Sequence, residues 1–270
     1  MSARVVGMAR LLPLRLVGAE RGRHLVERNL LAYRRNWLVL VSGAFEPLFY
    51  LFAVGIGVGG LVGDMAGPGG SPISYAAFIA PALLAAAAMN GSVFEMYNVY
   101  FKLRYEKLYD AALATPMQPR DIVVGEVTWS LLRSGLYATG FLLVAAVLGL
   151  VESWWGLLAV PSALLIGFCF ASATIAGATY MRSWQDFDLL LLLTIPMFLF
   201  SATFYPLDVY PPSFRWLTQL SPLYHGVEIV RALTLGILDV TLIAHAAVLI
   251  AIGSAGVLVA SRRIERLLLA

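Results

Sequence analysis

Charged residues are scarce in this 270-residue chain. Asp, Glu, Lys and Arg together supply 13 % of it and hydrophobic residues 60 %, whereas a soluble globular domain carries about 25 % and 45–50 %. A water-soluble fold of this length needs more charge than this to cover its surface. The mean hydropathy of +0.81 agrees, so the sequence predicts an integral membrane protein.

Cysteine, lysine and histidine are also sparse, which excludes several kinds of site. The single cysteine, Cys169, lies in an apolar run and rules out an intrachain disulfide and a cysteine-based metal site. The two lysines, Lys102 and Lys107, do not follow glycine, so the chain has no P-loop for ATP. The three histidines lack metalloprotease spacing, and we expect no metal or cofactor on this chain.

Six apolar runs are long enough to cross a bilayer, which takes roughly 18 or more residues. They lie near 38–61, 75–98, 123–150, 156–180, 187–206 and 240–260. The fold class that we expect is therefore an all-α integral membrane protein with six transmembrane helices. An earlier apolar stretch, residues 11–19, is interrupted by Arg15 and followed by Glu20, so we expect no cleaved signal peptide.

The segment before the first span is amphipathic. Val26, Leu30, Tyr33 and Trp37 recur at helical spacing on one face, and charged side chains occupy the rest. This pattern is typical of a helix that lies in the headgroup plane. We expect such an N-terminal interfacial helix at 23–37; a frayed basic tail is the alternative.

Basic residues are distributed unevenly between the loops. Most of the 19 Lys and Arg residues fall in the N-terminal segment, the second and fourth loops and the C-terminal tail, and the first and third loops have none. By the positive-inside rule, both termini lie in the cytoplasm. We therefore expect a multi-pass protein of the plasma (inner) membrane, in contact with lipid.

Residues 207–239 have the pattern of neither a loop nor a span. Prolines between Pro206 and Pro222 break them into two helical pieces, 213–220 and 223–235, which are apolar but too short to cross. Non-helical backbone at membrane depth must be satisfied by protein or water. The pattern favours an external re-entrant helical hairpin between spans five and six, with a loop lying on the headgroups as the alternative.

Glu46, Glu95, Glu126 and Arg133 are charged residues that fall within the predicted spans. A charge at the bilayer centre costs at least about 2.5–3.5 kcal/mol, so each needs a partner or a wet cavity. Glu46 and Arg133 each lie about 13 Å into the bilayer at helical rise, so an ion pair across adjacent helices is one hypothesis for them. Glu95 and Glu126 lie near cytoplasmic ends, where we expect contact with water or Arg104.

The role of this predicted pair is open between alternatives. Glu46 could line a polar strip for substrate with Phe45, Phe49 and Tyr50, or could form a structural ion pair with Arg133. A proton-coupled transporter, in which Glu46 and Arg133 relay protons, is a second class of function. A lipid-modifying enzyme is a third, against which the aqueous loops offer no nucleophile, metal cluster or facing carboxylates.

Three blocks of sequence carry a family resemblance. They are Glu46-Pro47-Leu48-Phe49-Tyr50-Leu51 with Gly55-Ile56-Gly57; residues 109–116 with Gly125, Glu126 and Trp129; and residues 196–201 and 203–208 with 221–225. Together they resemble the nodulation lipo-oligosaccharide exporter permeases of the type-2 ABC transporter superfamily, over about residues 25–260. Ala202 stands where that family often has glycine. The resemblance implies a type-2 ABC transmembrane domain at 23–270 after a flexible extension at 1–22.

The resemblance also implies what the chain does. It implies a permease subunit that is not itself an enzyme, pairs with a second permease copy as a homodimer, and docks a cytoplasmic ABC ATPase that binds ATP and Mg. Aromatic and small apolar walls suit an amphipathic cargo: a lipo-oligosaccharide, glycolipid, lipid-linked polysaccharide or hydrophobic drug. Nothing indicates a nucleic-acid partner.

Two segments take roles from the resemblance. The loop near 102–115, expected to be helical until Pro116, docks the ATPase, with the N-terminal helix as a second contact. Its predicted coupling residues are Lys102, Arg104, Tyr105, Leu108, Tyr109 and Ala112, four of which form an apolar stripe suited to a groove. A helix lying on the headgroups would show the same stripe. The predicted external gate comprises Phe204, Tyr205, Pro206 and Asp208.

Overall fold

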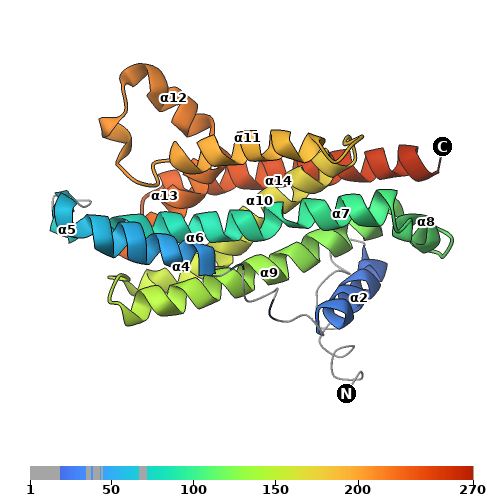
Figure 1. Ribbon diagram of the computed structural model, residues 1–270, viewed down its shortest axis with the longest axis horizontal. Helices are drawn as coiled ribbons and strands as arrows, with labels where there is room; N and C mark the ends of the chain where they lie inside the picture. The colour runs from blue at the N-terminus through green and yellow to red at the C-terminus, as the bar shows by residue number, and fades with distance from the viewer. Residues whose placement is uncertain (1–18, 35–37, 39–42, 44, 67–71, 270) are drawn as a thin grey trace.

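The computed structural model describes residues 19–34, 38, 43, 45–66 and 72–269 as an elongated bundle of helices (Figure 1). The regular structure of the described residues is helical, apart from two short strands. These strands, β1 (Asp64–Ala66) and β2 (Pro72–Ser74), pair antiparallel at one end of the bundle, with Asp64 opposite Ser74. The predicted all-α architecture is confirmed.

Five helical segments are long and apolar enough to cross a membrane. They are Phe45–Val62, made of α4 (Phe45–Tyr50), the π-helical η3 (Leu51–Val58) and α5 (Gly59–Val62); Tyr75–Arg104, made of α6 (Tyr75–Val93) and α7 (Glu95–Arg104); α9 (Pro119–Val147); Trp154–Ala178, made of η5 (Trp154–Leu158) and α10 (Ala159–Ala178); and α14 (Thr241–Leu268). They correspond to five of the six predicted spans.

The remaining predicted span, 187–206, is shorter in the structure. Helix α11 covers Asp186–Leu199, which is 14 residues or about 21 Å at helical rise, short of the roughly 30 Å hydrocarbon core. The chain leaves the helix at Phe200, and Ala202 adopts a left-handed conformation with φ 55°. The predicted C-terminal end of this helix is therefore wrong.

The segment after α11 folds as two helices separated at Pro222, as predicted. After the short η6 (Leu207–Val209), α12 (Pro212–Leu220) projects from the bundle (Figure 1). Helix α13 (Pro222–Leu235) packs against α6, α10 and α14, and its Leu223, Val227 and Val230 are fully buried. Only the second helix of the hairpin thus belongs to the core.

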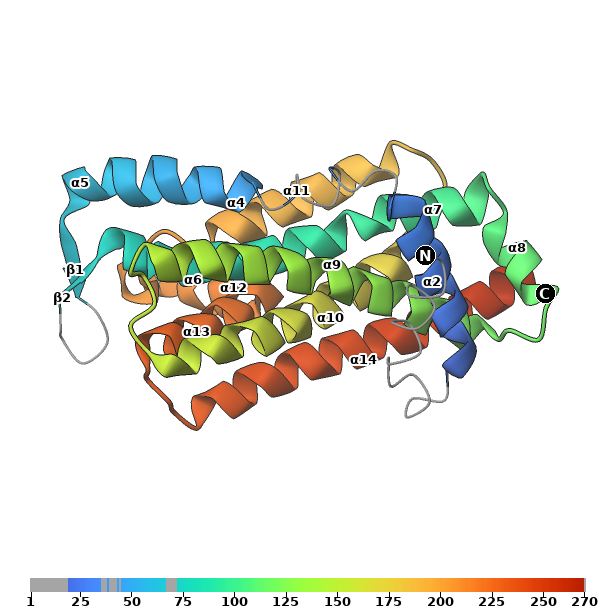
Figure 2. The same ribbon diagram turned by 90° about the horizontal axis from the view of Figure 1, so that it is seen from below.

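The N-terminal helix crosses the other end of the bundle (Figure 2). Helix α2 covers Arg23–Arg34 after η2 (Glu20–Gly22), and the last part of the predicted helix, residues 35–37, lies outside the described residues. Gly22 and Gly125 permit its close approach to α9, because a Cβ on Gly125 would lie 2.7 Å from the Gly22 carbonyl oxygen. This crossing direction suits the predicted in-plane helix.

The loop before α9 is not one continuous helix. Helix α7 ends at Arg104, Lys107 is left-handed with φ 49°, and α8 covers Leu108–Leu113. The predicted single helix over 102–115 is therefore wrong. A sharp turn at 105–107 points α8 back toward the bundle, which lets Tyr109 become fully buried.

Candidate functional site

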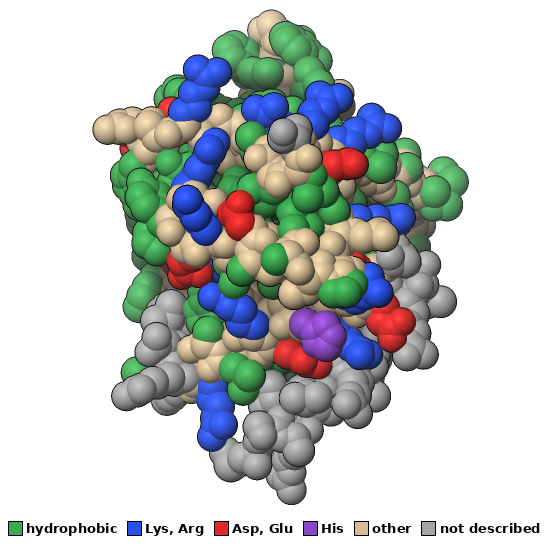
Figure 3. Space-filling model, turned by 90° about the vertical axis from the view of Figure 1, so that its right-hand side faces the viewer, with side chains coloured by type: hydrophobic (Ala, Val, Ile, Leu, Met, Phe, Trp, Pro, Cys, Tyr) green, Lys and Arg blue, Asp and Glu red, His purple; other side chains and the backbone are tan. Residues whose placement is uncertain are grey.

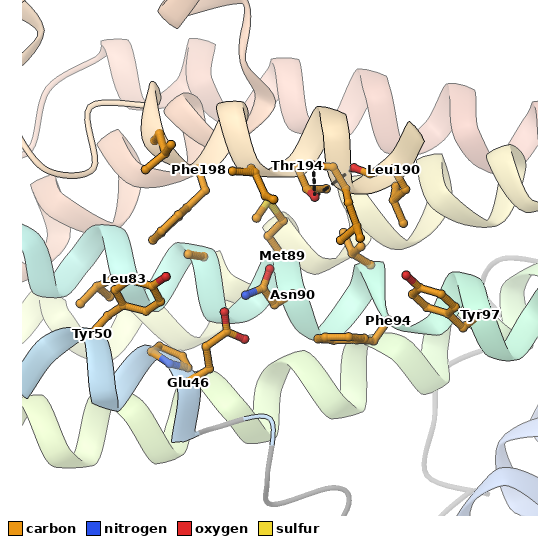
Figure 4. Close-up of a pocket in the computed structure, with 16 residues that line it drawn as sticks. Glu46, Tyr50, Leu83, Met89, Asn90, Phe94, Tyr97, Leu190, Thr194 and Phe198 are labelled. Carbon is orange, nitrogen blue, oxygen red and sulfur yellow. Dashed lines mark hydrogen bonds between the residues drawn. The ribbon is translucent and has the colours of Figure 1, made fainter. Parts of the chain in front are cut away.

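A cavity of about 300 Å³ lies between α4, α6 and α11 (Figure 4). Its walls are mainly apolar and aromatic, with Leu83, Met89 and Phe198 among them. Glu46 supplies the carboxylate and Asn90 the amide of this wall, and both side chains point into the same part of the cavity (Figure 4). A mostly apolar pocket with a few polar groups is typical of sites for small or amphipathic ligands.

The structure divides the predicted substrate strip between two faces of α4. Glu46 and Tyr50 line the cavity, where the Tyr50 ring meets Phe198 edge-on at 5.6 Å between centroids. Phe45 and Phe49 lie on the outer surface, 48 % and 67 % exposed, and stack on each other. This division follows the helical period, because residues four apart share a face.

Arg133 pairs with Glu95 and not with Glu46, so the predicted ion pair is wrong. Its Nη1 lies 2.8 Å from Glu95 Oε2, and its guanidinium lies within 6 Å of the ring centroids of Tyr33 and Tyr137. Glu95 is fully buried, so the expected contact with water is also wrong. Arg104 donates instead to the Met181 carbonyl oxygen.

The Glu126 carboxylate is a buried junction between elements. Its Oε2 accepts hydrogen bonds from Lys102 at 2.8 Å and from Asn29 at 3.0 Å, and its Oε1 accepts one from Tyr109 at 3.0 Å. Lys102 also lies 3.6 Å from Glu95. Glu95, Lys102, Glu126 and Arg133 therefore form one buried charge network with two acidic and two basic members, and the expected exposure of Glu126 is wrong.

Sequence reasoning missed this network, although the spacing contains a signal for it. Glu95 and Lys102 are seven residues apart, as are Glu126 and Arg133. Seven residues make about two helical turns, so each pair shares a face. On two antiparallel helices these faces match only with Glu95 opposite Arg133 and Lys102 opposite Glu126.

The predicted coupling residues fall into two groups. Lys102 and Tyr109 face the interior, and burial, together with the Glu126 carboxylate, raises the pKa of Tyr109 well above its usual value. The Tyr109 hydroxyl therefore stays protonated and donates. Arg104 and Tyr105 are exposed and face outward, whereas Leu108 and Ala112 are half-buried and pack against the core around Tyr109.

The predicted gate residues lie between α11 and α12, at the end opposite α2. Phe204 meets Phe198 of the cavity edge-on at 5.4 Å, and Tyr205 packs on Tyr210 at 4.7 Å. Arg215 donates to the Asp208 carbonyl oxygen. Pro206 directly precedes η6. The segment is thus in contact with the cavity wall through one aromatic pair.

Helices α2 and α8 and the C-terminal part of α14 meet at one end of the bundle (Figure 2), and this end is rich in basic side chains (Figure 3). Its exposed basic residues include Arg104, Lys107, Arg120, Arg182, Arg262 and Arg266. We call it the basic end. The loops that the charge distribution assigned to the cytoplasm thus gather on one side of the molecule.

Among the residues that the structure describes, no group of three or more His, Cys, Asp or Glu could hold a metal ion. His225 and His245 approach to 2.6 Å between their Nδ1 atoms and join α13 to α14. The candidate functional sites among the described residues are the cavity, the charge network and the basic end. A multi-pass helical bundle with these features has the architecture of a membrane transport subunit.

Comparison with known proteins agrees with this class. The family of ABC-2 type transporters matches residues 21–235, and the chain belongs to that family. It is 35 % identical to Nodulation protein J of Rhizobium meliloti (strain 1021), over 77 % of this chain and 79 % of the relative. With Nodulation protein J of Neorhizobium galegae the identity is 32 %, covering 80 % and 82 %. Inner membrane transport permease YadH of Escherichia coli (strain K12) is 25 % identical, covering 81 % and 84 %.

Proposed function

We propose that this chain is the permease subunit of an ATP-binding cassette exporter that moves an amphipathic cargo out across the plasma membrane. The observation that carries the proposal is the cavity between α4, α6 and α11 in a chain of the ABC-2 family. Its apolar and aromatic wall suits an acyl chain or a fused ring. The Glu46 carboxylate and the Asn90 amide suit the hydroxyl and amide groups of a sugar.

The cargo classes that fit this wall are a lipo-oligosaccharide, a glycolipid, a lipid-linked polysaccharide and a hydrophobic drug. The similarity to two proteins named Nodulation protein J favours the lipo-oligosaccharide. A lipid-linked sugar also presents both halves of the chemistry that the cavity offers, an apolar tail and hydrogen-bonding hydroxyls.

The proposal includes six membrane crossings by this chain. Helix α11 together with the chain that follows it makes the fifth crossing, and α12 and α13 form a re-entrant hairpin on the outer side. The basic end faces the cytoplasm, with both termini there, in keeping with its exposed Lys and Arg side chains. Phe204, Tyr205, Pro206 and Asp208 close the outer end of the pathway.

Energy comes from a separate ATPase chain that binds ATP and Mg, since this sequence has no P-loop. The docking surface is the outward side of α8 and the turn before it, where Tyr105 is 60 % exposed. Helix α2 supplies a second contact. A second copy of this chain completes a homodimer, for which the exposed aromatic face of α4 is suited.

Export by inside-out vesicles tests the proposal. The permease and its ATPase are co-expressed, and uptake of a labelled lipo-oligosaccharide is followed with ATP, without ATP, and with ATP plus a protonophore. We expect uptake that requires ATP and survives the protonophore. Uptake that continues without nucleotide and collapses with the proton gradient would instead establish the proton-coupled transporter and refute the ATP-driven one.

A further inference from the structure

One buried carboxylate joins three separate elements at the basic end. Glu126 of α9 accepts hydrogen bonds from Asn29 of α2, Lys102 of α7 and Tyr109 of α8. All four residues are buried. Breaking one member away would leave an uncompensated charge or polar group in the interior, so these elements are energetically bound to move together.

The contacts continue from this junction toward the cavity. Lys102 approaches Glu95, Glu95 pairs with Arg133, and Arg133 lies 3.4 Å from the Tyr137 hydroxyl. The Tyr137 ring packs closely on Gly91, where a Cβ would come within 2.9 Å of it. Gly91 directly follows Asn90 of the cavity wall. A continuous series of buried contacts thus runs from α8 to the cavity.

We propose that Glu126 and Tyr109 are positioning residues that couple movement of α8 to the shape of the cavity. This inference rests on the proposed function, in which the ATPase pushes on α8. Tyr109 carries the movement from α8 to α9 through its single hydroxyl. Glu95, Lys102 and Arg133 carry it on to α6.

The same contacts could serve a purely structural role, and a structural role and a coupling role differ in what a substitution changes. Loss of a structural contact changes folding and yield alone. A coupling device also sets how much cargo is exported per ATP hydrolysed, because a shared two-state movement is what links the two sites.

The test uses the permease–ATPase complex in proteoliposomes, with labelled lipo-oligosaccharide as cargo. The variant Tyr109→Phe removes one hydroxyl and keeps the ring in place. We expect ATP hydrolysis to continue while cargo exported per ATP falls about fivefold or more, the lower range of measured coupling between sites. Tyr180→Phe is the matched control, since Tyr180 lies exposed outside the charge network and outside the proposed docking surface, and its ratio should match the wild type.

A second variant, Glu126→Gln, removes the charge of the acceptor in the same link, and the thermal stability of every variant is measured so that loss of fold is distinguished from loss of coupling. The double variant should be no worse than the poorer single one, because both remove the same link. If the wild-type complex shows no nucleotide-dependent export, the proposed function itself fails. If the wild type exports and Tyr109→Phe keeps the wild-type ratio, whatever its thermal stability, the coupling role is overturned.

Discussion

At the scale of single residues, burial makes the members of the charge network dependent on one another. Glu95 and Arg133 are each more than nine-tenths buried, and an ionised group in that position is tolerated only when it is paired and hydrogen-bonded. The aromatic rings of Tyr33 and Tyr137 lie beside the guanidinium and add cation–π contacts. Removing the charge of Glu95 or Arg133 alone therefore lowers the stability of the fold more than removing both charges.

The variant Arg133→Met tests this dependence. It leaves Glu95 with Lys102 at 3.6 Å as its remaining partner, and we expect the protein to lose about 3–5 kcal/mol of stability, as measured by thermal unfolding in detergent. The double variant Glu95→Gln with Arg133→Met should recover part of that loss. Arg182→Met is the control, because Arg182 is exposed. Equal melting temperatures for all variants would contradict the argument.

Glu46 lies in the wall of the cavity and is not part of the charge network. Replacing it by Gln removes the charge and keeps the shape, so we expect the fold to survive and ATP-dependent cargo export to fall about tenfold, the effect of one charged hydrogen bond. Export is measured against the amount of protein in the membrane. Glu152→Gln, an exposed carboxylate away from the cavity, serves as control. Unchanged export would remove Glu46 from the pathway.

The sequence singled out Glu95, Glu126 and Arg133, which are buried, but it did not identify Lys102 or Arg231 as buried, and it paired Arg133 with the wrong carboxylate. Depth along a helix placed Glu46 and Arg133 at one level, yet depth does not specify which way a side chain points. The rotation of α4 turns Glu46 toward α6 and α11. Arg133 faces α7, where Glu95 lies at the matching register. Pairing is a property of two helices together, and hydrophobicity alone does not determine it.

At the scale of elements, the end of α11 shows where local pattern fails. An apolar run through residue 206 predicts helix, but the chain turns at Ala202 in a left-handed conformation. Arg231 of α13 donates to the Ala202 carbonyl oxygen at 2.6 Å and lies over the Phe78 ring at 4.2 Å. A residue 29 positions away thus fixes the turn. Glycine, which the resembling family often has here, adopts this conformation without strain.

The packing of α2 on α9 gives a prediction at this scale. A Cβ on Gly125 would meet the Gly22 carbonyl oxygen at 2.7 Å, a backbone atom that moves only if the chain around it moves. We expect Gly125→Ala to destabilise this contact by about 1–3 kcal/mol. Faster hydrogen exchange of the α2 amides and a lower melting temperature would report it.

Helix α9 contains its own control for that experiment. Gly140 lies in the same helix with open space around its Cβ position. Gly140→Ala should therefore leave α2 unaffected and stabilise the helix by up to about 1 kcal/mol. If both variants behave alike, close approach at Gly125 is not what holds α2 in place.

At the scale of the whole molecule, hydropathy, proline positions and charge were enough to predict five spans, the two helices on either side of Ser221 and the gathering of basic loops at one end. The cavity was not predictable, because it requires the relative rotation of three helices that are distant in sequence. Its wall draws on α4, α6 and α11, and each contributes a few side chains that hydropathy cannot distinguish from lipid-facing ones.

The direction of the molecule in the membrane gives the last prediction. Cys169 is buried, so a Cys169→Ser background leaves no reactive thiol, and single cysteines can then report each end. Lys107→Cys marks the basic end, and Leu61→Cys, at an 88 % exposed position of α5, marks the opposite end. Because retention of Lys and Arg in the cytoplasm sets orientation, a membrane-impermeant maleimide added to intact cells should label the α5 position alone. Lys107→Cys should react only after permeabilisation. The reverse pattern would place the charge network and α8 on the outer side, out of reach of any cytoplasmic ATPase.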